Sequence, residues 1–152
     1  MAINLDGNGL NTTGLINSAT AQASTSGTSI DITGIPSGVR RVTVMLNGVS
    51  TNGSSPLQLQ IGSGSVTTSG YATGAAYGTT SGAQYGTAST GFLLEPTGNA
   101  AAANALYGQI VLSLFGSNTW VGAGGFFLSN GPISCHCSGG SPALGGALDR
   151  VR

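Results

Sequence analysis

Residues 41–49 read RVTVMLNGV, and this stretch decides the fold class of the chain. β-Branched Val and Thr fill three of its first four positions. Their side chains are stiff near the backbone and fit a pleated strand better than a helix. Asn-Gly pairs at 47–48 and 52–53 are turn or bulge signals at its end. The stretch therefore predicts a β-strand over Arg41–Val49.

The segments on either side of this strand extend the β pattern. Ser29–Thr33 (SIDIT) and Leu57–Ile61 (LQLQI) alternate apolar and polar residues, so each is predicted to be a strand with one buried face. Between SIDIT and the decisive strand, Gly34–Gly38 (GIPSG) places Pro and Gly as a tight turn requires. The chain from 29 to 61 is thus predicted to be short strands joined by turns.

Further along the chain, Gly62–Thr90 consists mainly of Gly, Ser, Thr and Ala, which is typical of a loop or of weak strands at a tip or interface. Strand and turn signals predict the remaining elements. These are a short strand over Gly91–Glu95, a helix or a loop over Ala100–Ala105, a hairpin of Tyr107–Phe115 and Trp120–Leu128 around Gly116–Thr119, a Gly/Pro/Cys-rich loop, and a last strand over Leu144–Val151. Roughly seven strands at this spacing predict an all-β fold, a β-sandwich or jelly roll.

Residues 1–20 differ from the rest because they are polar and rich in Gly, Asn and Thr. We expect them to form an extended N-terminal arm that docks on a neighbouring protein, and a flexible leader is the alternative. The arm precedes a β-sandwich domain over residues 21–152. The residues expected to hold it in an assembly are its apolar ones, Ile3, Leu5, Leu10, Leu15 and Ile16.

Charge is scarce in this sequence. Charged residues make up 5% of the chain, against about 25% in an ordinary soluble domain. Lys is absent and the net charge is zero, so no field exists to hold nucleic acid or an anionic membrane surface. A neutral surface offers little resistance to self-association, and few large apolar residues are available for a core within one chain. We therefore expect a homo-oligomer, a trimer, without a nucleic-acid partner.

The sequence also bears on where the protein resides. Its first residues lack the basic flank and apolar stretch of a signal peptide. The most apolar stretches, Leu106–Phe115 and Trp120–Leu128, are each too short to span a bilayer as a helix. We expect a protein made in the cytoplasm and not inserted into a membrane.

Four stretches carry a resemblance to a known family. They are ITGIPSGVRRVTVMLNGVSTNGSSPLQLQIGSGS at 32–65, TGFLLE at 90–95, NTWVGAGGFFLSNG at 118–131 and GGALDRVR at 145–152. Together they resemble a domain of tailed-bacteriophage virion proteins, commonly tail fibre or tail structural proteins. The resemblance covers about residues 19–152, and the block at 34–53 is its most specific part.

This resemblance implies an oligomeric β-sandwich of the virion, near the distal part of a fibre, with no catalytic motif to transfer. The opening MAINLDGNGLNTTGL resembles the leaders of short phage fibre and decoration proteins, which implies other virion proteins as partners of the arm. Chains of this kind usually continue past the LDRVR-like strand. The resemblance therefore implies that the domain is truncated after Arg152.

Cys135, His136 and Cys137 are three potential metal ligands in a row. Structural zinc sites take four ligands, typically from separated pairs, and the sequence contains no other Cys or His. We interpret the group as a loop thiol pair, and we predict no metal and no cofactor. A metal on an oligomer axis, to which each chain gives one His136, is the alternative.

Catalytic arrangements are equally incomplete. A triad of Ser134 or Ser138 with His136 and Asp149 is excluded on one strand, because neighbouring residues cannot place an oriented base between nucleophile and carboxylate. The four acids are far apart in sequence, whereas glycoside hydrolysis needs two carboxylates flanking one bond. We predict that the chain is not an enzyme, and a depolymerase with a site between subunits is the remote alternative.

Two further features have a structural and a functional interpretation. Arg40 and Arg41 are expected to pair with Asp31 or Asp149 rather than to form a basic contact for a partner. Trp120 is expected to pack in the core rather than to stack on a sugar.

The function predicted from sequence is that of a short tail fibre or receptor-binding module in the virion. The residues that could contact the host are Tyr71, Tyr77 and Tyr85, because a Tyr ring offers a flat apolar face and a hydroxyl to a cell-surface glycan. Packing of these tyrosines against neighbouring subunits is the other interpretation. The alternative function is that of a capsid decoration or head-fibre protein that stabilises the head.

Overall fold

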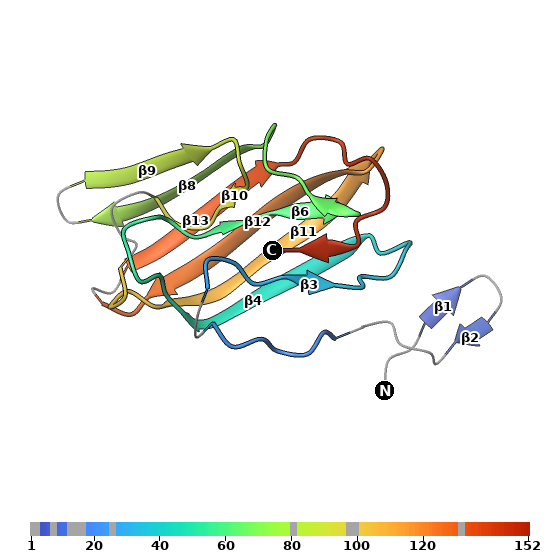
Figure 1. The fold of residues 1–152 in the computed structure, drawn as a ribbon, viewed down its shortest axis with the longest axis horizontal. Helices are drawn as coiled ribbons and strands as arrows, with labels where there is room; N and C mark the ends of the chain where they lie inside the picture. Colours follow the sequence, from blue (N-terminus) through green and yellow to red (C-terminus); the bar gives the residue numbers. More distant parts are fainter. Residues whose placement is uncertain are drawn as a thin grey trace.

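The computed structural model describes residues 4–6, 9–11, 18–24, 27–79, 82–96, 101–130 and 133–152. These residues form an all-β fold in which every strand pairing is antiparallel (Figure 1). Among them no helix is long and apolar enough to cross a membrane. The strands are β1 (Asn4–Asp6), β2 (Gly9–Asn11), β3 (Ile32–Thr33), β4 (Arg41–Val49), β5 (Gln58–Leu59), β6 (Ile61–Ser63), β7 (Ser65–Val66), β8 (Ala72–Thr79), β9 (Gly82–Ala88), β10 (Phe92–Leu93), β11 (Leu106–Gly116), β12 (Thr119–Leu128), β13 (Ile133–Gly140) and β14 (Arg150–Val151).

A six-stranded sheet in the order β4-β11-β12-β13-β8-β9 forms the larger layer. Along most of β4, exposed side chains alternate with half-buried ones. This is the period of a strand that packs one face against a core. The strand predicted over Arg41–Val49 is confirmed with these bounds.

β11 and β12 form a long hairpin near the centre of this sheet, which confirms the hairpin predicted from the sequence. Ser117 and Asn118 connect the two strands, and their φ angles are 48° and 58°. Positive φ at both central residues defines a type I′ turn, whose twist matches that of the flanking strands. The register shifts between Leu114 and Gly116, so Phe115 is the extra residue of a β-bulge.

The second layer consists of the sheet β3-β14-β6-β7 and the pair β5-β10, and it lies in front of the large sheet in Figure 1. The hydrophobic core lies between the layers, as in a β-sandwich. The position predicted for Trp120 in this core is confirmed. The largest fully buried apolar side chains come from both layers and include Trp120, Phe92, Ile61, Leu106, Ile110, Leu112 and Leu128.

Gly122 brings the second layer close to the large sheet. A Cβ on Gly122 would lie 2.8 Å from Leu112 Cδ2 and 3.0 Å from Phe92 Cε1. A Cβ on Gly139, its partner on β13, would instead lie 2.5 Å from Thr73 Cγ2 on the neighbouring strand β8. Phe92 therefore packs against the sheet where Gly122 leaves no room for a side chain.

Two predictions for the C-terminal part are wrong. The Gly/Pro/Cys-rich loop contains β13, an inner strand of the large sheet, because β12 and β8 pair with its two edges. The last strand is β14, and it covers only two residues of the predicted range Leu144–Val151.

Two alternatives that the sequence left open are resolved. The small-residue region at 62–90 contains β8 and β9, which form a hairpin-like pair at one edge of the large sheet. At 101–105 the chain forms a turn and not a helix, with the Asn104 N–H donating to the Ala101 carbonyl at 2.9 Å.

Within the expected arm, β1 and β2 pair as a small antiparallel sheet in which Leu5 is the partner of Leu10. The other residues proposed to hold the arm, Ile3, Leu15 and Ile16, lie outside the described residues.

Candidate functional site

The three tyrosines predicted to contact a host or a neighbouring subunit do not gather on one surface. Tyr85 lies on β9 with 81% of its surface exposed. Tyr77 is half-buried and packs against the core. Tyr71 is 4% exposed, so the prediction is wrong for this residue.

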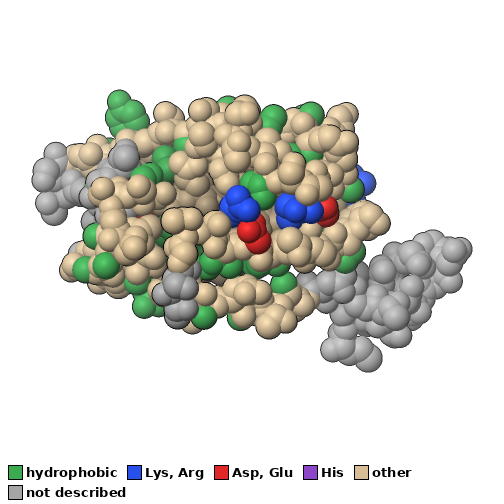
Figure 2. Space-filling view, viewed as in Figure 1, with side chains coloured by type: hydrophobic (Ala, Val, Ile, Leu, Met, Phe, Trp, Pro, Cys, Tyr) green, Lys and Arg blue, Asp and Glu red, His purple; other side chains and the backbone are tan. Residues whose placement is uncertain are grey.

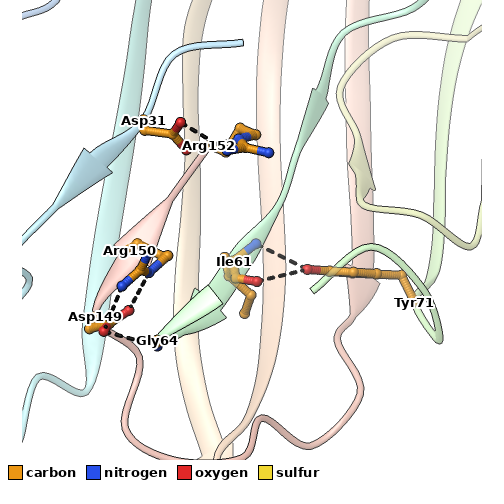
Figure 3. Close-up of polar contacts among 7 residues, drawn as sticks. All are labelled: Asp31, Ile61, Gly64, Tyr71, Asp149, Arg150 and Arg152. Carbon is orange, nitrogen blue, oxygen red and sulfur yellow. Dashed lines mark hydrogen bonds and ion pairs between the residues drawn. The ribbon is translucent and has the colours of Figure 1, made fainter. Parts of the chain in front are cut away.

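Tyr71 instead joins a loop to the second layer (Figure 3). Its hydroxyl accepts a hydrogen bond from the Ile61 N–H at 3.0 Å and lies 3.0 Å from the Thr67 carbonyl oxygen, which it can donate to. Its ring meets Phe92 edge to face, with centroids 5.5 Å apart. Burial raises the pKa of the hydroxyl. Tyr71 is thus a structural residue of the core.

Cys135, His136 and Cys137 lie on β13 and not on a loop, which corrects the sequence interpretation. Both thiols are free and buried among the core residues, whereas His136 is exposed on the opposite side of the strand. Burial is the main cause that raises the pKa of each thiol to about 11. The three side chains do not converge, and the part of the chain that the structure describes holds no group of three His, Cys, Asp or Glu suited to a metal ion.

Acidic and basic side chains pair on the face of the second layer that Figure 2 shows. Arg152 donates two hydrogen bonds to Asp31, at 2.8 and 2.9 Å, and Arg150 donates two to Asp149, at 2.7 and 3.1 Å (Figure 3). These bonds are the main cause that lowers the pKa of both aspartates, that of Asp149 to about 2. The partners expected for Arg40-Arg41 are thus bound by the C-terminal arginines, so that prediction is wrong.

The residues considered for catalysis lie apart. His136 is on the outward side of the large sheet, whereas Asp149 belongs to the other layer and is bound to Arg150. Glu95 is 1% exposed, with the Leu57 N–H donating to its Oε1 at 3.3 Å. The structure therefore brings neither the Asp149 nor the Glu95 carboxylate to His136.

The face of the large sheet that points away from the second layer, here called the outer face, is nearly free of charge and carries large exposed apolar side chains among polar ones. Met45 is 76% exposed on it, and Tyr107 and Phe127, which are partners across β11 and β12, are 41% and 45% exposed. Among Lys, Arg, Asp and Glu, only Arg41 occupies an outward position in the six strands. An antiparallel sheet that faces water is ordinarily polar on that side. This outer face therefore has the character of a contact surface.

Two shallow depressions of about 410 and 620 Å³ hollow the outer face. Both are bordered by Ser138, so they adjoin and form one trough. The first lies over β11, β12 and β13 and the second over β13, β8 and β9, and neither depression is lined by a titratable side chain. The residues used below to define this trough are Ala72, Gly74, Ala123, Ser138 and Gly139.

Sequence reasoning missed the outer face, although β11 carries a signal for it. Tyr107, Val111 and Phe115 alternate there with Ile110 and Leu112, so both faces of the strand are apolar. Strands covered on both faces have this pattern. The sequence alone does not supply the strand register, which is what assembles such residues from different strands into one surface.

The outer face with its trough is therefore the candidate functional site, and its exposed large side chains are suited to contact with another surface. Comparison with protein-family models, with curated proteins and with solved structures gives no significant match to this chain.

Proposed function

We propose that the chain is a structural subunit of a bacteriophage particle, a short tail fibre or receptor-binding module that works as a homo-oligomer. In this proposal the outer face is buried against protein when the particle assembles, except at the edge strand β9, whose outward-facing Tyr85 stays exposed at the rim. The arm at residues 1–20 binds other virion proteins, and the assembled protein resides in the virion. The resemblance of residues 19–152 to virion domains supports the phage assignment.

The single observation that carries the assembly role is the composition of the outer face. Met45, Tyr107 and Phe127 are exposed on it, and Arg41 is its one formally charged residue within the six strands. Exposed apolar surface is costly in water, and large contiguous patches mark interaction sites. A subunit that buries this face in an assembly removes that cost.

The proposed role is not enzymatic. Of the acids whose side chains are described, Asp31 and Asp149 are bound to arginines and Glu95 is buried. The trough offers no side chain that could act as an acid, a base or a nucleophile with a lowered pKa.

Purified particles test the assignment. We expect quantitative mass spectrometry to find the protein in them, and electron microscopy with a tagged chain to place it on the tail. A copy number comparable to that of the capsid protein, with the tag on the head, would favour the decoration function instead. Absence of the protein from the particles would contradict both assignments.

Host contact is proposed for Tyr85, the tyrosine of the predicted three that is largely exposed. We expect Tyr85→Ala to reduce phage adsorption to cells without changing particle yield, because an exposed ring can stack on a sugar. Tyr85→Phe, which keeps the ring, is the matched control and should adsorb normally. Normal adsorption by the Ala variant would refute this role of Tyr85.

A further inference from the structure

The outer face carries a cluster of large side chains at one corner and a shallow trough farther along the strands. The raised part, here called the ridge, consists of Met45, Gln109, Tyr107 and Phe127. Their register places them next to one another, because Met45 is the partner of Gln109 and Tyr107 that of Phe127. Side chains at such positions share one face and lie within contact range. The ridge therefore covers the ends of β4, β11 and β12 that lie at this corner of the sheet.

The trough lies farther along the same strands and toward the other edge of the sheet. Cross-strand pairing joins Ala123 on β12 to Ser138 on β13, and Ser138 to Gly74 on β8. From Phe127 to Ser138 the path runs one strand across and four residues along, which amounts to roughly 14 Å. Ridge and trough are thus separate features of one continuous surface.

The outer face is large enough for a specific interface. The six strands lie about 4.8 Å apart, and about seven residues along each strand contribute to the outer face. The outline of this face is therefore roughly 25 by 25 Å, or about 600 Å² per chain. Two such faces together bury about 1,200 Å², the lower end of the range for specific protein interfaces. The outer face can also contact a copy of itself without strong repulsion between like charges. Arg41 is the one Lys, Arg, Asp or Glu at outward positions of the six strands.

We propose that the outer face binds a second copy of this chain, with the ridge of one copy seated in the trough of the next. This inference rests on the proposed use of the outer face in assembly and names its partner. The ridge carries Met45, Tyr107 and Phe127, and the trough is lined mainly by Gly, Ala, Ser, Thr and Val, so the large side chains of one copy can seat in the shallow trough of another. Such a contact forms a two-fold pair, a ring, or an open filament where the rotation does not close, and the expected trimer is one such ring.

Charge substitutions test this contact in the full chain. Phe127→Glu places a carboxylate on the ridge, and Ser138→Arg places a guanidinium in the trough; both native side chains are exposed, so either substitution leaves the core intact. We expect light scattering to report a multiple of 14.8 kDa for the native chain and 14.8 kDa for each single variant. The double variant brings Glu and Arg together between copies, so its mass should return to the native multiple.

Ser55→Glu, in the exposed loop after β4, is the matched control and should keep the native mass. Circular dichroism shows whether each variant is folded. A native chain that stays monomeric, or folded single variants that keep the native mass, would overturn the inference. So would a double variant that remains monomeric.

Failure of this inference differs from failure of the proposed function. A monomeric chain that is nevertheless found in particles, with its outer face covered by a different virion protein, refutes only the contact between copies. A chain that oligomerises through the outer face but is absent from particles refutes only the phage assignment.

Discussion

The carboxyl group of Glu95 is buried in the interior and has few hydrogen-bond partners there. The Leu57 N–H donates to Oε1, and Oε2 has no hydrogen-bond partner among the described residues. Burial is the main cause that raises the pKa of this carboxyl above its usual value of 4.5. The residue therefore opposes folding whenever it must be ionised.

The sign of the pH dependence follows from this raised pKa. The protonated carboxyl is fully compatible with the fold below the unfolded pKa, and stability is lost as the pH rises through the folded pKa. We expect Glu95→Gln, which is neutral at every pH, to be more stable than the native chain near pH 8 and similar to it near pH 4. Thermal unfolding of both proteins across this range measures the difference. An equal loss of stability with rising pH in both would contradict the assignment to Glu95.

The thiols of Cys135 and Cys137 are a second test at the residue scale. They are buried on one side of β13, and burial raises their pKa values to about 11. Both exposure and thiolate formation control reactivity. We expect no reaction with a thiol reagent in the folded protein and reaction of both thiols in denaturant. Rapid modification under native conditions would show that β13 is not an inner strand.

At the scale of the element, amino-acid composition separates the strands that could be predicted from the sequence from those that could not. β4 and the β11–β12 hairpin were predictable, because β-branched and aromatic residues recur there with period two and a two-residue turn separates the hairpin strands. β13 and β8 were not, because Gly, Ala, Ser and Cys carry little strand preference of their own. Pairing with neighbours on both edges, which is a tertiary effect, makes them strands.

Thr73 shows how a short strand is held in this fold. Its hydroxyl accepts a hydrogen bond from the Leu93 N–H at 3.3 Å and donates to the Gly91 carbonyl at 2.8 Å, so β8 anchors β10. Thr73→Val keeps the shape and removes both bonds, and leaving buried polar groups unpaired costs about 1–3 kcal/mol. We expect a loss of this size in denaturant unfolding.

Thr73→Ser is the matched control, because it keeps the hydroxyl and removes only a methyl group. We expect it to lose less stability than Thr73→Val. Equal losses for the two variants would assign the effect to packing rather than to the anchoring hydrogen bonds.

At the scale of the whole molecule, the all-β class and a core around Trp120 could be predicted from the sequence, whereas the outer face could not. Alternation shows that a strand has two faces, but only the register β4-β11-β12-β13-β8-β9 brings Met45, Tyr107 and Phe127 into one surface. The tyrosines were misjudged for the same reason. Tyr71 stands in a small-residue region that looks like a loop, yet it is enclosed between the layers.

The central claim is that the outer face is covered in the assembled protein. Met45 is the most direct probe, because it is 76% exposed in the single chain and oxidation of its sulfur is read by mass spectrometry. The measurement compares the rate of Met45 oxidation by hydroxyl radicals in the native assembly and in folded Phe127→Glu. We predict oxidation that is several-fold slower in the assembly. Equal rates in the two samples would contradict the claim.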